Sequence, residues 1–217
     1  MRQDIRSKSN QLTLAINSTN ESFSFALRYL KNDLPDKFFI KKFDKDLCTN
    51  LIVDFEEFTK KENLKNIERI SVSLGPSNFN ASRLIVVLAR TLSQQINCPL
   101  DSFSSFELMA KRIAIKNNIS CNKESFWIYK KLKRRGYIAG KYEVKNSGKM
   151  DGNFSVNETI IPKLFDKLKA IENIFQAEYD DVEDLKELLN LSNKNLKNSN
   201  NNSWEKVVPI YPLSPVN

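Results

Sequence analysis

Hydrophobic and polar residues alternate near the start of the chain in the pattern of a β-hairpin. Residues 11–16 are apolar and favour extended structure, and residues 22–28 place two phenylalanines and a leucine on one face of a second strand. The polar residues 17–21 between them favour a tight turn, because Asn, Ser and Thr side chains hydrogen-bond to nearby backbone groups. The chain is therefore predicted to open with two antiparallel strands.

Strands and helices are then predicted in alternation up to residue 117. Leu47, Leu51 and Phe55 recur at helical spacing, and Ser104 with Glu107 fits a capping box at the start of a later helix. This alternation is typical of an α/β domain, which we place at residues 1–117. The predicted elements after the hairpin are strands over 37–43, 67–74 and 100–103, and helices over 44–63, 81–95 (capped by Asn80) and 105–116.

The second half of the chain has a weaker pattern and is expected to form a smaller lobe over residues 118–217. Its Asn-rich residues 192–203 are poor in apolar side chains and are predicted to be a mobile loop. Pro162 suits the first position of a helix. The predicted elements are strands over 124–130 and 136–144, a turn over 145–153, and helices over 162–173 and 182–191.

Composition excludes several classes of enzyme. The 217 residues include no histidine, so the chain has no Ser-His-Asp triad, no Cys-His pair and no HExxH zinc site. Lys and Arg number 34 against 26 Asp and Glu, which gives a net charge of +8. A basic chain of this kind favours a setting in which RNA is present.

The cysteines and apolar runs indicate a cytoplasmic protein without a membrane segment. Cys48, Cys98 and Cys121 show no CxxC spacing, so we expect reduced thiols, with neither a disulfide framework nor a metal site. Residues 1–10 lack the hydrophobic stretch of a secretory signal. The longest strongly apolar run, Leu84–Ala89, is far shorter than a membrane span.

Two loops are candidates for holding a phosphate group. The hairpin turn carries Asn17, Ser18 and Thr19, and a turn rich in hydroxyls and backbone N–H groups can surround an anion. Residues 75–80 lie between a strand and a helix, where N–H groups and the positive end of the helix dipole point outward. Both patterns are also those of ordinary turns, and the second loop lacks the GK[ST] ending of a P-loop.

A basic run between two tyrosines is a candidate contact to RNA. Positive charges beside aromatic rings can follow a nucleic-acid backbone, while a solvated β-turn is the structural alternative. The basic residues of this run are Lys130, Lys131, Lys133, Arg134 and Arg135.

Four segments of the chain together resemble the TsaB family. LTLAINSTNESFSFAL is similar to the opening hairpin of that family, and ISVSLGPSNFNASRLIVVLARTLSQQINCPLDSFSSFELMA is similar to its next strand, loop and helices. LKRRGYIAGKYEV and the closing VVPIYPLSPV are similar to two later segments. The chain departs from the family at Asn17, where the family has Asp, and in having fewer glycines in residues 75–81.

The resemblance implies a fold and a function. The fold would be α/β, an ASKHA (actin/Hsp70-like) fold with two related lobes, the second one shortened. Members of the TsaB family are non-catalytic partners of TsaD, the threonylcarbamoyl transferase. With the ATPase TsaE they support threonylcarbamoyladenosine modification of tRNA next to the anticodon. The resemblance thus implies no cofactor of the chain's own, ATP or ADP at the junction with TsaD, tRNA contact through the complex, and room for a homodimer.

The resemblance also implies that two helices of the first lobe bind the partner. The apolar run in the helix over 81–95 fits this reading, because a helix without a polar face needs partners on more than one side. The candidate interface residues are Leu47, Leu51, Phe55, Arg83, Val86, Val87 and Arg90.

Two other functions stay open from the sequence alone. One is an ASKHA-type phosphotransferase or glycoprotease-like enzyme, against which the missing histidine and Asn17 speak. The other is a basic RNA-binding module that uses residues 130–135. Tight, salt-dependent binding of tRNA without a partner would favour this module.

Overall fold

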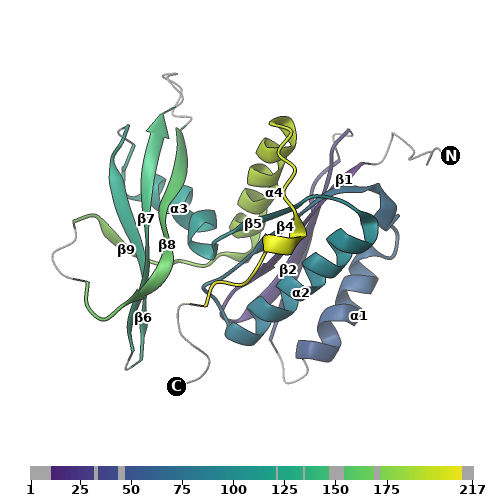
Figure 1. The fold of residues 1–217 in the computed structure, drawn as a ribbon, viewed down its shortest axis with the longest axis horizontal. Coiled ribbons are helices and arrows are strands. Elements are labelled where there is room, and N and C mark those ends of the chain that lie inside the picture. Colours follow the sequence, from purple (N-terminus) through teal and green to yellow (C-terminus); the bar gives the residue numbers. More distant parts are fainter. Residues whose placement is uncertain are drawn as a thin grey trace.

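Two β-sheets with helices between them and on one outer side make up the molecule, as Figure 1 shows. The computed structural model describes residues 11–31, 34–43, 47–120, 122–133, 135–146, 154–168 and 172–211. No helix within these ranges is long and apolar enough to cross a membrane.

The first sheet has five strands in the order β3-β2-β1-β4-β5. The hairpin strands pair antiparallel, as do β2 and β3, whereas β1, β4 and β5 run parallel to one another. Strand β1 is buried along its whole length, because helices cover both faces of this sheet. The strands are β1 (Leu12–Ser18), β2 (Ser22–Tyr29), β3 (Lys37–Lys42), β4 (Ile67–Ser73) and β5 (Leu100–Phe103).

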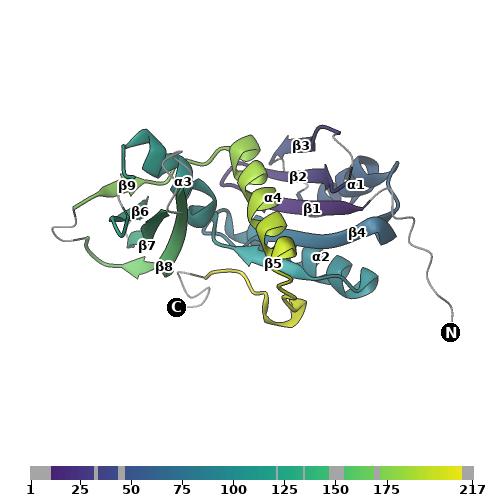
Figure 2. The same cartoon turned by 90° about the horizontal axis from the view of Figure 1, so that it is seen from above.

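Three helices cover this sheet. α1 (Leu47–Thr59) and α2 (Phe79–Ile96) lie side by side on one face, and α4 (Asp181–Lys197) lies on the other, as Figures 1 and 2 show. The face under α1 and α2 is filled by large side chains of the sheet, among them Phe23, Phe25 and Ile70. The opposite face carries Ala15 directly across from Ala26. These small side chains let the leucines of α4 pack close to the strands.

The second sheet has four strands in the order β8-β7-β6-β9 and carries one packed helix. α3 (Ser105–Lys116) lies between the two sheets and packs its apolar side chains against Phe126, Ile128 and Tyr142. The Ser104 side chain accepts a hydrogen bond from the Glu107 backbone N–H, which is the predicted cap of α3. The strands are β6 (Ser125–Leu132), β7 (Gly136–Asn146), β8 (Phe154–Phe165) and β9 (Ile174–Gln176).

The Asn-rich segment, at the end of α4 and after it, hydrogen-bonds to a buried ion pair between two strands of the first sheet. Arg69 of β4 donates to Asp101 of β5 at 2.9 and 3.0 Å, and both side chains are buried. Ser192, Asn195 and Asn202 donate to the same carboxylate at 3.0, 3.0 and 2.7 Å. These hydrogen bonds compensate the desolvation of the Asp101 charge.

Most predicted elements are confirmed, and the differences have physical reasons. The described residues among 162–173 do not form a helix: Pro162 lies in β8, an edge strand with a register shift against β7, where a missing N–H is tolerated. Residues 192–197 continue α4 and are not part of a loop. Asn78, and not Asn80, caps α2, with its side chain accepting from the Ala81 N–H. The predicted turn over 145–153 lies mostly outside the described residues.

The predicted smaller lobe over 118–217 contains a helix that packs on the first sheet. The chain leaves β9, and α4 then contacts β1, β2 and β4 as well as α3. Two short helical turns, η1 (Leu64–Asn66) and η2 (Trp204–Lys206), complete the described elements. Trp204 of η2 also packs against the core of the first sheet.

Candidate functional site

The turn between β1 and β2 folds around the hydroxyl of Thr19. Thr19 Oγ1 accepts hydrogen bonds from the backbone N–H groups of Glu21 and Ser22 at 3.3 and 3.1 Å. The Thr19 N–H donates to the Ser22 carbonyl at 2.9 Å. The N–H groups of Thr19, Glu21 and Ser22 are therefore bonded within the turn and are not free to bind a phosphate.

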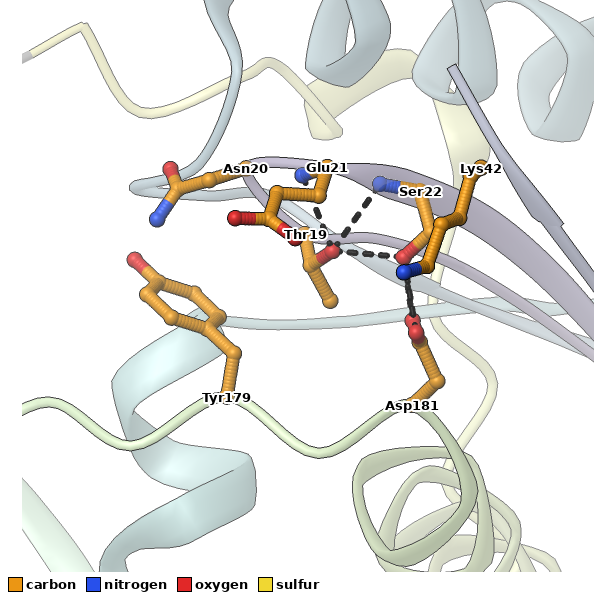
Figure 3. A pocket seen from close by; sticks show the side chains of 7 residues that line it. All are labelled: Thr19, Asn20, Glu21, Ser22, Lys42, Tyr179 and Asp181. Atoms are coloured by element: carbon orange, nitrogen blue, oxygen red, sulfur yellow. Dashed lines mark hydrogen bonds between the residues drawn. The ribbon is translucent and has the colours of Figure 1, made fainter.

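A cavity of about 270 Å³ opens between this turn and the segment that leads into α4 (Figure 3). Asp181 lies across the cavity from the turn, and Ser22 Oγ lies 2.7 and 2.8 Å from its two carboxylate oxygens. The Thr19 and Ser22 hydroxyl oxygens are 2.6 Å apart. The lining residues are Thr19, Asn20, Glu21, Ser22, Lys42, Tyr179 and Asp181.

The electrostatics of the cavity are set by its carboxylates. Burial raises the pKa of Asp181, the hydrogen bond from Ser22 opposes this, and the neighbouring Asp180 and Glu21 raise the pKa further. A site with this charge repels a phosphate group, and Lys42 is the only cation among its lining residues. Thr19 and Ser22 are buried as well, so their hydroxyls are poorly placed to attack a substrate.

The other two candidate phosphate ligands point away from the cavity into the protein. Asn17 is buried, and its Nδ2 has no partner among the described residues. The Ser18 N–H donates to Ser73 Oγ at 3.2 Å, and a chain of hydroxyls continues from Ser18 to Ser77 at 3.0 Å and to Ser82 at 2.6 Å. These hydrogen bonds connect the hairpin turn to the loop over 75–80. The sequence analysis treated the two as separate candidate sites for a phosphate.

Lys130 connects the second sheet to the hairpin turn and is not a free basic residue. Its Nζ donates to Asn20 Oδ1 and lies 5.7 Å from the centroid of the Tyr179 ring, while burial lowers the pKa of its amine. Tyr179 in turn donates its hydroxyl to the Pro76 carbonyl. Of the remaining basic run, Lys131, Lys133 and Arg135 are exposed and Arg134 lies outside the described residues.

The residues predicted for the partner face fall into two groups. Leu51, Phe55 and Val86 are 2%, 6% and 1% exposed and belong to the core under α1 and α2. Val87 is 61% exposed and points to solvent. The side chain of Leu47 lies outside the described residues.

The arginines of α2 lie against aromatic rings at its surface. The Arg83 guanidinium is 5.5 Å from the centroid of Phe79, and that of Arg90 is 5.6 Å from the centroid of Trp204. Ile52 and Val53 of α1 are exposed and were missed, because the prediction followed the apolar stripe that faces the sheet. Their position beside that stripe, one and two residues after Leu51, is the signal that could have found them.

The described residues contain no group of three or more Asp, Glu or Cys side chains placed to hold a metal ion. Cys98 is buried and is in no disulfide among the described residues, whereas Cys121 and the side chain of Cys48 lie outside the described residues. The predictions of no metal and no bound cofactor remain predictions.

The described elements form an α/β protein of two lobes that meet at the hairpin turn, as expected from the sequence. Two solved structures share this fold over nearly the whole chain. YeaZ from Pseudomonas aeruginosa superimposes with a TM-score of 0.64 and 14% identity, covering 93% of this chain and 99% of that one.

The second is an uncharacterized protein with similarity to the peptidase YeaZ from Pseudomonas aeruginosa. It superimposes with a TM-score of 0.61 and 15% identity, over 94% of this chain and 100% of that one. No model of a known protein family and no curated protein sequence matches the chain. The resemblance to the TsaB family, of which YeaZ is a member, is therefore confirmed at the level of the fold.

Proposed function

We propose that the chain is a non-catalytic partner of TsaD, the transferase that completes threonylcarbamoyladenosine in tRNA. The observation that carries this proposal is the match to YeaZ, which extends over 99% of that protein. In this role the protein is cytoplasmic, and it reaches tRNA through the complex with TsaD and TsaE.

The hairpin cavity supports a role without catalysis. In phosphate-handling proteins of this fold class, the first hairpin presents free N–H groups and a carboxylate that works with a metal ion. Here the N–H groups of Thr19, Glu21 and Ser22 are bonded within the turn, and Asn17 replaces the carboxylate. Asp181 adds an acidic side chain to the cavity. Any ATP or ADP of the complex would then bind at the junction with TsaD.

The outer surface of α1 and α2 is the face that we assign to TsaD or to a second copy of the chain. Ile52, Val53 and Val87 are exposed apolar residues on these two neighbouring helices, and Arg83 and Arg90 flank Val87 along α2. Burial of apolar side chains with arginines beside them is typical of protein interfaces.

Size-exclusion chromatography with light scattering, on the purified chain mixed with its cognate TsaD, tests this proposal. The double variant Ile52→Asp/Val87→Asp should lose the hetero-complex while keeping the thermal transition of the wild type, since both positions are exposed. Ile161→Asp is the matched control, because Ile161 is equally exposed but lies on β8 of the second sheet.

Two results would contradict the proposal. One is that the wild type elutes alone at micromolar concentration with TsaD, TsaE and ATP present. The other is that the purified chain turns over ATP without TsaD, which would favour the enzyme alternative. A charge at Val86 is unsuitable for this test, because Val86 is buried and its substitution would disturb folding.

A further inference from the structure

The second sheet has one face that no described helix covers. α3 packs on this sheet through Phe126, Ile128 and Tyr142, and α3 and α4 lie between the two sheets in Figure 1. Side chains alternate between the two faces of a strand. Trp127 and Tyr129 therefore point away from α3, toward the outer side of the sheet.

The register brings two pairs of aromatic rings onto this outer face. Tyr137 of β7 lies across from Lys131 of β6 and from Phe165 of β8, so all three share the outer face. The ring centroids of Trp127 and Phe165 are 5.7 Å apart, and those of Tyr129 and Tyr137 are 6.0 Å apart. All four rings are partly exposed, which leaves ring surface available to a flat ligand.

Lysines alternate with these rings and have no acidic partner in the described part of the chain. Lys131 and Lys163 are exposed, and Lys141 is half-buried on the same face. The ammonium groups of these three lysines take part in none of the salt bridges or side-chain hydrogen bonds of the described residues, and Lys141 accepts a hydrogen bond only through its backbone carbonyl. The Lys163 ammonium lies 5.5 Å from the centroid of the Phe165 ring. Glu143 is an acidic residue on this face and lies toward the far end of β7 from Tyr137.

Partly exposed aromatic rings between unpaired lysines on an open sheet match the chemistry of unpaired nucleotides. Bases that are not in a duplex stack on such rings, and lysines neutralise the phosphates between them. In a duplex the bases stack on one another and do not reach a flat sheet face. The net charge of +8 adds a long-range attraction for a polyanion.

We propose that this face binds single-stranded segments of RNA, with bases stacked on Tyr129, Tyr137 and the Trp127–Phe165 pair, and phosphates at Lys131 and Lys163. This face differs from the RNA contact predicted at the basic run over residues 130–135, since Lys130 points inward to Asn20. The site belongs to the chain itself and does not depend on the proposed partnership with TsaD.

Fluorescence anisotropy with a labelled, unstructured RNA of about ten nucleotides, and with its duplex, tests the site on the full chain. The double variant Lys131→Gln/Lys163→Gln should weaken binding at least tenfold at low salt. It should also reduce the slope of log K against log salt by about 1.4, since each lost phosphate contact contributes about 0.7. Lys60→Gln/Lys186→Gln is the matched control, because it removes two exposed charges near the first sheet, one directly after α1 and one on α4.

A second variant separates stacking from charge. Tyr129→Leu keeps an apolar side chain in β6 but removes the flat ring, and it should weaken binding roughly tenfold. Tyr211→Leu is its control, since Tyr211 is exposed and lies against the Phe79 ring, near Leu132 and Ile138 on the opposite face of this sheet. Circular dichroism verifies that each variant is folded.

Any of the following results would overturn the proposal. The first is equal loss of binding in the two lysine double variants, which would mean unspecific attraction by net charge. The second is binding of the duplex as tight as that of the single strand. The third is no binding by the wild type, or no difference between Tyr129→Leu and Tyr211→Leu.

Discussion

The two sheets of this protein differ in how their faces are covered. β1 of the first sheet is buried at every position, because α1 and α2 lie on one face and α4 on the other. β6 of the second sheet alternates between buried and partly exposed residues, because α3 packs on one face only. Apart from its edge strand β3, the first sheet is thus an interior, and most of its contacts to partners would be made through its helices, while the second sheet offers strand residues directly to a ligand.

The sheets also differ in how they treat buried charge. Under the first sheet, the Asp101 carboxylate receives donors from Arg69 and three further side chains. Beside the second sheet, Glu158 accepts from Ser104 and Tyr142 at 2.5 and 2.9 Å, without a cation among its hydrogen-bond donors. Burial and the nearby Glu158 raise the pKa of Glu107 to about 7. The first arrangement pairs its carboxylate with a guanidinium, whereas burial in the second raises the pKa of Glu158 and favours its protonated form.

Among changes that test this difference between the two sheets, Asp101→Ala is expected to have the largest effect on stability. This change leaves the Arg69 guanidinium buried without its carboxylate, and it should lower the free energy of unfolding by about 3–5 kcal/mol. Chemical denaturation measures this loss. Arg69→Met should cost less, since Asp101 keeps three donors from residues 192–202. A greater loss in Arg69→Met would contradict this account.

The second prediction concerns the pH dependence that Glu107 imposes. Its pKa is raised from 4.5 to about 7 in the folded protein, so folding favours the protonated form. This stabilisation is complete below pH 4.5 and is lost as the pH rises through 7. In the wild type the free energy of unfolding should therefore fall between pH 4.5 and 8, and Glu107→Gln should reduce this fall by roughly 1–3 kcal/mol. Thermal unfolding across the pH range measures the difference. An unchanged profile would show that Glu107 titrates normally.

A smaller effect is expected where the second sheet meets the hairpin turn of the first. Tyr179→Phe removes the hydroxyl that donates to the Pro76 carbonyl and keeps the ring beside Lys130. The loss of one partly buried hydrogen bond should cost about 1 kcal/mol. Differential scanning calorimetry would measure it, and it would also detect whether the two sheets begin to unfold in separate transitions. Stability equal to the wild type would mean that this hydrogen bond contributes nothing.

The smallest effect is predicted for the surface ion pair of Lys60 with Glu57. Both side chains are largely exposed and lie three residues apart, so Lys60→Gln should change stability by less than about 0.5 kcal/mol. Denaturation at low and high salt measures this change. A loss above 1 kcal/mol would indicate a role of Lys60 in packing that the structure does not explain.

Local patterns made the first sheet predictable from the sequence. The hairpin, the cap at Ser104 and the strand over 67–74 each depend on residues that are close along the chain. Prediction was wrong at Pro162, because the position of β8 at a sheet edge is a property of the whole fold. It was also wrong for residues 192–197, since the bonds of Ser192 and Asn195 to Asp101 connect residues more than ninety positions apart.

The site residues were harder to predict than the fold. Helical spacing identified the stripe of Leu51 and Phe55 but not that this stripe faces the sheet. Side chains alternate between the two faces of a strand, so Lys130 points inward and Lys131 outward. A run of consecutive basic residues does not show this alternation in the sequence. The outer face of the second sheet combines residues from three strands, so no single stretch of sequence displays it.

The Asn-rich residues 192–203, at the end of α4 and just after it, should be kept when the chain is shortened for experiments. By composition, residues 192–203 look dispensable, and a shortened chain ending at Leu191 would be a natural choice for crystallisation. Such a version would expose the Arg69 guanidinium and strip Asp101 of three of its donors. We expect the shortened chain to be poorly soluble or unfolded, because the Asn-rich residues cover the buried Arg69–Asp101 ion pair and hydrogen-bond to it.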